Sequence, residues 1–208
     1  MTSETHFDDP DCWAVVAQAL ARQQCVVFPT DTVYGIAARA DSLAAVERLQ
    51  RAKGRTDAFP PPVLVADAGQ AWTLVSAVPL AARNLGTAFW PGALTLILPT
   101  TRSDLGLSAS VGTVGVRVPD HDDLRALLRR TGPLAVSSAN KHNRPPATTV
   151  GEARDQLGDA VAVYIDGGPT PGPAPSTVVD CTGAELVIVR LGLLTPEQIQ
   201  AAAGVSDA

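Results

Sequence analysis

Residues 26–38 read VVFPTDTVYGIAA, and this stretch indicates the class of fold. An apolar run ends at a proline, and four polar side chains then follow within five residues: Thr30, Asp31, Thr32 and Tyr34. The pattern predicts a buried strand that opens into a hydroxyl-rich loop, which is where ligands bind in open α/β sheets. In an extended segment the alternating hydroxyls of Thr30, Thr32 and Tyr34 point to one side. A turn with polar decoration is the alternative.

The composition predicts a globular protein with one large domain. Of the 208 residues, 46% are hydrophobic but only 4% aromatic, so the core must be built from Ala, Val and Leu. No apolar run approaches the roughly 18 residues that a membrane span needs. The formal net charge of −5 argues against a broad, nonspecific grip on nucleic acid.

The first residues and the cysteines indicate a cytoplasmic protein. Residues 1–11 are acidic and lack the basic and apolar regions of a secretory signal. Cys12, Cys25 and Cys181 are scattered and odd in number, which is typical of buried thiols in a reducing compartment. We therefore expect neither a disulfide framework nor a cysteine-based metal site.

Periodicity and capping signals predict a twisted mixed β-sheet flanked by helices in a single α/β domain. We expect residues 11–203 to form this domain, after a flexible N-terminus at 1–10 and before a tail at 204–208. Helices are predicted at residues 11–23, 43–53, 70–77, 79–88 and 121–130, with others beginning after the caps Thr149 and Thr195. Strands are predicted at 63–65, 94–98, 113–118, 134–136 and 160–165, with a terminal hairpin at 177–179 and 186–189. We also expect the glycine- and proline-rich loop at 166–175 to act as a lid.

Four cationic side chains could neutralise phosphates: Lys53, Arg55, Arg117 and Arg190. Arginine suits bidentate binding of oxyanions, and lysine acts as a point charge. Taken singly, each is more simply a solvated charge at the end of an element. Arg117 is harder to dismiss, because it interrupts an apolar strand.

Other familiar chemistries find no support. The chain has no glycine-rich dinucleotide fingerprint, no phosphate-binding P-loop and no G-x-S-x-G nucleophile elbow. His6, His121 and His142 have no ligand spacing, so we expect no dedicated metal site and place them on the surface or in loops. Asp31 could act as a base, but an aspartate beside threonines usually bonds its own backbone.

Six motifs in order resemble the YrdC/Sua5 family, and within it the short bacterial threonylcarbamoyl-AMP synthases. They are FPTDTVYG (28–35), KGR (53–55), FWPGALTL (89–96), GVRVP (115–119), SAN (138–140) and STVVD (176–180). Each motif alone is weak, but the ordered set extends over nearly the whole chain. The resemblance implies a twisted α/β sheet around a deep, positively lined cavity. We expect no extra carboxyl-terminal domain of the longer Sua5 type.

The resemblance also implies a reaction and its residues. L-Threonine, bicarbonate or CO2, and ATP with Mg2+ would give threonylcarbamoyl-AMP and pyrophosphate for the t6A modification of tRNA. Candidate partners are then tRNA and the proteins of the t6A pathway, with no membrane involved. The K-x-R and S-x-N signature implies catalytic roles for Lys53, Arg55, Ser138 and Asn140. Threonine would contact Thr32, Arg117, Ser138 and Ser176, whereas ATP would contact Arg55, Thr113, Asn140 and Arg190.

The segment after the K-x-R motif departs from the family pattern. Residues 56–62 read TDAFPPP, and Leu64 or a neighbour stands where some members have a histidine that contacts threonine. Two alternatives therefore stay open. One is a carbamoyl-adenylate enzyme that acts on another acceptor, and the other is a non-catalytic RNA-binding module.

Overall fold

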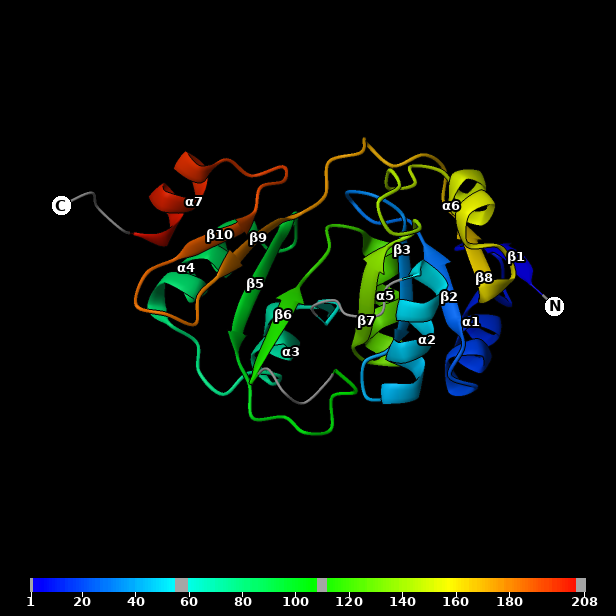
Figure 1. Cartoon of the computed structure of the whole chain (residues 1–208), viewed down its shortest axis with the longest axis horizontal. Coiled ribbons are helices and arrows are strands. Elements are labelled where there is room, and N and C mark those ends of the chain that lie inside the picture. The colour runs from blue at the N-terminus through cyan, green and yellow to red at the C-terminus, as the bar shows by residue number, and fades with distance from the viewer. Residues whose placement is uncertain (1, 55–59, 108–111, 205–208) are drawn as a thin grey trace.

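The computed structural model describes residues 2–54, 60–107 and 112–204, and ten strands of this part form one sheet (Figure 1). The strand order is β1-β8-β2-β3-β7-β4-β6-β5-β9-β10, with parallel and antiparallel neighbours mixed. The strands are β1 (Ser3–His6), β2 (Cys25–Phe28), β3 (Gly35–Arg39), β4 (Val63–Leu64), β5 (Leu94–Pro99), β6 (Thr113–Arg117), β7 (Leu134–Ser138), β8 (Val161–Asp166), β9 (Thr177–Asp180) and β10 (Val187–Arg190). The mixed α/β sheet that the sequence predicts is confirmed.

The stretch at residues 26–38 folds as two antiparallel strands, β2 and β3, joined by the polar loop. Val27 pairs with Ile36, and Phe28 pairs with Gly35. A Cβ at Gly35 would lie 2.8 Å from Cγ1 of Val136, so the glycine lets β7 approach β3 closely. This close pairing brings the polar loop beside Ser138, the last residue of β7, and Asn140 follows two positions later.

Seven helices in the described part of the chain flank the sheet. They are α1 (Cys12–Ala21), α2 (Leu43–Lys53), α3 (Ala68–Trp72), α4 (Leu80–Phe89), α5 (Asp122–Thr131), α6 (Val150–Leu157) and α7 (Pro196–Ala203), with a 3₁₀ turn at Gly158–Ala160. Of these, α1, α5, α2 and α6 cover both faces of one half of the sheet. Because successive side chains of a strand point to opposite faces, Val26 and Phe28 pack with α1 and α5, whereas Val27 packs with α2 and α6.

The other half of the sheet is covered on one face by α3, α4 and α7. Along β5, Leu94, Leu96 and Leu98 point into this core, whereas Thr95 and Ile97 point to the opposite face. The same alternation in β6 buries the valines and turns Thr113, Gly115 and Arg117 the other way. The polar residues of these strands therefore share the face without helices.

Several elements differ from the sequence prediction. The N-terminus expected to be flexible contains β1, which pairs in parallel with β8 and extends the sheet by one strand. The helix predicted at 70–77 is only five residues long, at Ala68–Trp72. By contrast, the predicted caps are confirmed: the hydroxyls of Ser42, Thr149 and Thr195 each accept a hydrogen bond from a backbone N–H of their helix.

Two further observations concern the ends of the chain and membranes. Residues 205–208 of the predicted tail lie outside the described residues. Within the described ranges, no helix has the length and apolar character that crossing a membrane requires.

Candidate active site

Arg117, at the end of β6, is fixed by three hydrogen bonds in different directions. Its Nε donates to the carbonyl of Gly92 at 3.0 Å, Nη1 to Oγ1 of Thr32 at 3.2 Å, and Nη2 to Oδ1 of Asp31 at 2.6 Å. Burial lowers the pKa of the Arg117 guanidinium, and the Asp31 carboxylate opposes that shift. The guanidinium stays charged, because arginine is not deprotonated in proteins.

A second guanidinium, from Arg190 in β10, lies on the same wall. Its Nη2 donates to the carbonyl of Ser176 at 2.8 Å and to the hydroxyl of Ser176 at 3.1 Å. That hydroxyl is also 3.0 Å from Oγ1 of Thr95, so β5, β10 and the residue before β9 meet at this point. Burial and the nearby charge of Arg117 lower the pKa of Arg190. Two cations therefore share one wall of the site.

Lys53 supplies the cation of the opposite wall. It is the last residue of α2, which ends at Gly54 in the left-handed conformation with φ of 69°. The Lys53 Nζ donates to the carbonyls of Ser138 and Asn140, the latter at 2.9 Å, and lies 3.4 Å from Oδ1 of Asn140. The side-chain amide of Asn140 donates in turn to the carbonyl of Arg144 at 2.7 Å, which fixes the loop after β7.

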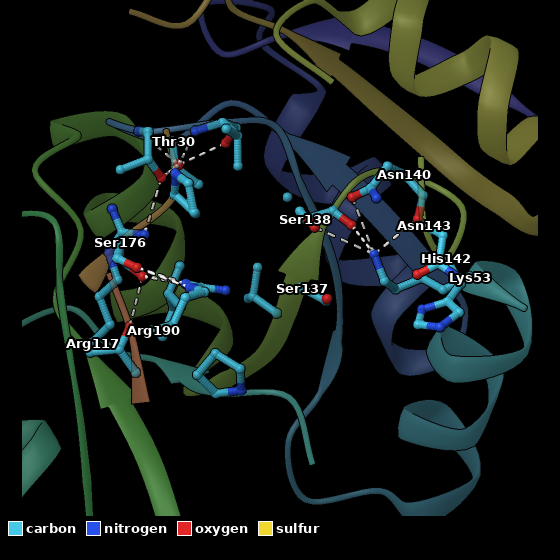
Figure 2. A pocket seen from close by; sticks show the side chains of 18 residues that line it. Thr30, Lys53, Arg117, Ser137, Ser138, Asn140, His142, Asn143, Ser176 and Arg190 are labelled. Carbon is cyan, nitrogen blue, oxygen red and sulfur yellow. Dashed lines mark hydrogen bonds between the residues drawn. The ribbon is translucent and has the colours of Figure 1, made fainter. Parts of the chain in front are cut away.

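Arg117 and Arg190 face Lys53 across a pocket, as Figure 2 shows. The volume of this pocket is about 190 Å³. Seven of the residues that sequence reasoning selected line it together: Thr32, Lys53, Arg117, Ser138, Asn140, Ser176 and Arg190. In the part of the chain that the structure describes, every buried side-chain nitrogen and oxygen has a hydrogen-bond partner. The polar groups of the pocket are therefore held in place before any ligand binds.

A second pocket of about 430 Å³ adjoins the first and shares five of the described lining residues with it: Lys53, Pro62, Thr95, Ser137 and Arg190. Thr113 lines this second pocket and not the first. Its walls are largely apolar, formed by Leu49, Pro60, Pro61, Pro62, Ile97, Val178 and Val189. A small polar chamber thus opens onto a larger apolar one across a pair of cations.

Three predictions about individual residues need correction or fall outside the structure. The sequence predicts that Asp31 bonds its own backbone, but its carboxylate pairs with the distant Arg117. The hydroxyl of Tyr34 does not join those of Thr30 and Thr32. It donates instead to the carbonyl of Gly168 at 2.7 Å, since the loop is not extended through Tyr34. Arg55 lies outside the described residues.

The structure adds pocket residues that sequence reasoning did not select. They are Thr95, Ser137, His142 and Asn143, whereas Thr30 belongs to the hydroxyl-rich loop that the sequence singles out. Thr95 had a readable signal, because it is a hydroxyl residue between the leucines of an alternating strand. His142 had none, since its backbone N–H donates to the carbonyl of Lys53, a residue 89 positions earlier in the chain.

The loop at 166–175 is attached to the rest of the molecule at its beginning. Besides the Tyr34 contact, the backbone N–H of Thr170 donates to the carbonyl of Thr148 at 2.9 Å. The loop ends at Pro175, which lines the smaller pocket. Its role as a lid stays a prediction.

Comparison with known proteins now identifies the family. The Sua5/YciO/YrdC family model, described as telomere recombination, matches residues 18–192. The chain belongs to the Sua5/YciO/YrdC family. A relative from Mycobacterium tuberculosis, named putative threonylcarbamoyl-AMP synthase, is 47% identical over 91% of this chain and 88% of its own length. The threonylcarbamoyl-AMP synthase of Bacillus subtilis is 40% identical over 98% of this chain and 60% of its own length.

Solved structures agree with this Sua5/YciO/YrdC assignment. Pyrococcus abyssi Sua5, crystallised with L-threonine, matches with a TM-score of 0.89 at 31% identity over 98% of this chain and 61% of that one. Escherichia coli YciO matches with a TM-score of 0.82 at 25% identity over 96% of this chain and 98% of its own. The present chain thus spans most of YciO and about three fifths of the archaeal Sua5.

Proposed function

We propose that this Sua5/YciO/YrdC chain is a threonylcarbamoyl-AMP synthase of the nucleotidyltransferase class. It would convert L-threonine, bicarbonate or CO2, and ATP into threonylcarbamoyl-AMP and pyrophosphate. The observation that carries the proposal is the pair of adjoining pockets with Lys53 and Arg190 between them. Relatives with this name, and a threonine-bound Sua5 of the same fold, support it.

The two pockets differ in size and lining as the two substrates do. The smaller pocket carries the hydroxyls of Thr32, Ser138 and Ser176 beside the Arg117 guanidinium, which suits a small amino acid with a carboxylate. We assign the larger pocket, with its apolar walls and Thr113, to the nucleoside. Asn140 and Arg190 would hold the phosphates, as would Arg55 after Lys53.

The charges of the pocket fit the difficult step of this reaction. The neutral amine of threonine attacks CO2, and loss of the amine proton leaves a carbamate anion. A carbamate oxygen then attacks the α-phosphorus of ATP, and the bond to the pyrophosphate oxygen breaks. Both reactants are anions, so fixed cations at Lys53, Arg117 and Arg190 lower the repulsion between them. No covalent enzyme intermediate is needed, so positioning supplies much of the rest.

We further propose that Mg2+ enters together with ATP. The lining of the smaller pocket holds no carboxylate among the described residues, and Asp180 is the one in the larger pocket. This donor set does not fit a dedicated magnesium site, because the ion prefers carboxylate and phosphate oxygens. Its ligands would therefore be the triphosphate and water.

The product and its destination complete the proposal. The product would supply the t6A modification of tRNA in the cytoplasm, with tRNA and the proteins of that pathway as candidate partners. The acidic composition argues against tight direct binding of tRNA, because nonspecific affinity comes from neutralised phosphates. We therefore expect the small-molecule reaction to proceed without tRNA.

The test measures pyrophosphate release from ATP and Mg2+ with bicarbonate, in the presence of L-threonine, L-serine or no amino acid. We expect release that depends on threonine and bicarbonate, with threonylcarbamoyl-AMP identified by mass spectrometry. Calorimetry should show that a nonhydrolysable ATP analogue strengthens threonine binding, since both ligands share Lys53 and Arg190.

Two results would favour the alternatives. ATP turnover indifferent to threonine would indicate a carbamoyl-adenylate enzyme with another acceptor. Tight, salt-sensitive tRNA binding by folded protein without any ATP turnover would indicate an RNA-binding module. Either result would contradict the synthase proposal.

A further inference from the structure

Asp31 stands apart from the other charged groups of the site, because it contacts a pocket residue without lining the pocket. Its side chain and that of Arg117 are only 12% and 7% exposed, and their atoms Oδ1 and Nη2 lie 2.6 Å apart. Thr30 and Thr32, its neighbours on either side, do line the pocket. The carboxylate therefore reaches the site only through the guanidinium.

We infer that Asp31 is a positioning residue that sets the orientation of Arg117 for the carboxylate of the amino-acid substrate. This inference rests on the proposed synthase function, and it names a role for a residue with no assigned part in the site. It also explains why the polar loop and the turn before β5 converge on the end of β6: the loop supplies two acceptors to the Arg117 guanidinium and the turn supplies one.

The geometry of the hydrogen bonds supports this role. The carbonyl of Gly92 holds Nε, and the hydroxyl of Thr32 holds Nη1. Asp31 is the partner of Nη2 and the only charged one of the three. Nη1 and Nη2 each carry a second N–H, so a planar five-donor fork held in this way keeps donors for a carboxylate.

The nearest other charges make the orientation important. Arg190 is close enough to Arg117 to lower its own pKa, so the two guanidiniums repel each other. Without the carboxylate, Arg117 would keep only neutral partners against that repulsion. A guanidinium that turns away by one rotamer no longer meets the substrate, because buried side chains occupy discrete staggered positions.

The experiment compares Asp31→Ala, Asp31→Asn and Arg117→Lys in the full chain with the pyrophosphate-release assay. Asp31→Ala should raise the KM for threonine by about tenfold to hundredfold, the range for a lost hydrogen bond to a charged group. The KM for ATP should stay within about twofold, since the contacts of Lys53 and Arg190 do not include Asp31. Asp31→Asn keeps an oxygen that accepts from Nη2, so its KM for threonine should stay within about fivefold.

A double variant separates positioning from direct contact. If Asp31 acts only through Arg117, Asp31→Ala combined with Arg117→Lys should have the same KM for threonine as Arg117→Lys alone. Multiplication of the two effects would overturn the inference. Asp41→Asn is the matched control, because Asp41 pairs with Arg39 on the exposed surface and should change neither KM.

The remaining outcomes are equally distinct. An unchanged threonine KM in Asp31→Ala, or an equal rise of both KM values, would overturn the inference. If thermal unfolding shows that Asp31→Ala does not fold, Asp31→Asn alone decides. A rise of more than about tenfold in its KM for threonine would mean that Asp31 supplies charge and not orientation, which would overturn the inference. A wild type without threonine-dependent turnover would instead reject the proposed function, before any variant is compared.

Discussion

Replacement of Gly192 by alanine should separate β10 from β9 and disturb the Arg190 site. An added Cβ would lie 2.2 Å from the carbonyl oxygen of Pro175, 2.5 Å from the carbonyl carbon of Ser176 and 2.6 Å from the nitrogen of Thr177. All three are backbone atoms of the neighbouring chain segment, so no side chain can turn away to make room. The chain after β10 must move outward by about 1 Å to reach an ordinary contact distance.

The size of the effect follows from this shortfall. Overpacking by one methyl group typically costs about 1–3 kcal/mol, and a clash with fixed backbone lies at the upper end. About 3 kcal/mol lowers Tm by about 6–12 °C in a chain of this size. The hydrogen bond from Nη2 of Arg190 to the Ser176 carbonyl, 2.8 Å long in the wild type, should also break. The affinity for ATP should then fall about tenfold.

The matched control is Gly151→Ala in α6, where the nearest atom to an added Cβ is 4.0 Å away. This variant should be equal to wild type or more stable by up to about 1 kcal/mol, because alanine favours helix. Thermal unfolding and calorimetry with an ATP analogue measure both quantities. A Gly192→Ala variant as stable as Gly151→Ala would refute the steric argument. Reduced stability with unchanged nucleotide affinity would refute the link to Arg190.

Four further predictions concern the pockets and the thiols. Lys53→Met should lower kcat/KM about a hundredfold, as loss of a preorganised cation of about 3 kcal/mol does, whereas Lys141→Met outside the pockets should stay within about threefold in the same assay. Thr113→Val should raise the KM for ATP by about threefold to tenfold with little change for threonine, as steady-state kinetics will show. Burial raises the pKa of Cys25 and of Cys181 to about 12, so the native thiols should resist an aromatic disulfide reagent at pH 8 that titrates all three cysteines after unfolding. Because these folded pKa values exceed the unfolded ones, the contribution of the two thiols to the free energy of unfolding should be constant below about pH 8 and fall as the pH rises through 9 toward 12, which denaturant titrations can follow.

Local patterns predicted the elements and the face on which the site lies. The alternation of valine with Thr113, Gly115 and Arg117 in β6 already indicates which side chains leave the core. Capping residues such as Ser42 and Thr195 fixed where helices begin, since their hydroxyls bond the first free N–H groups. Both signals are local, so a single sequence contains them.

The partners of the charged groups could not be predicted in the same way. Asp31 and Arg117 are 86 residues apart, and nothing in either segment specifies the register that brings them to 2.6 Å. Strand β1 was missed for a related reason. Its four residues are mostly polar and exposed, so only the neighbouring β8 reveals them as a strand. Long-range pairing, and not propensity, decides such positions.

The charge of the site is opposite to that of the whole chain. The protein carries a formal −5, yet Lys53, Arg117 and Arg190 meet around one small pocket. Collecting cations in a buried place is unfavourable, as the lowered pKa of each guanidinium indicates. Backbone carbonyls offset that cost, because Gly92, Ser176 and Asn140 each accept from one of the three cations. Carbonyls stabilise a cation without neutralising it, so the pocket keeps its attraction for anions. Asp31 is the exception among these partners, and this is why its role is best explained by orientation.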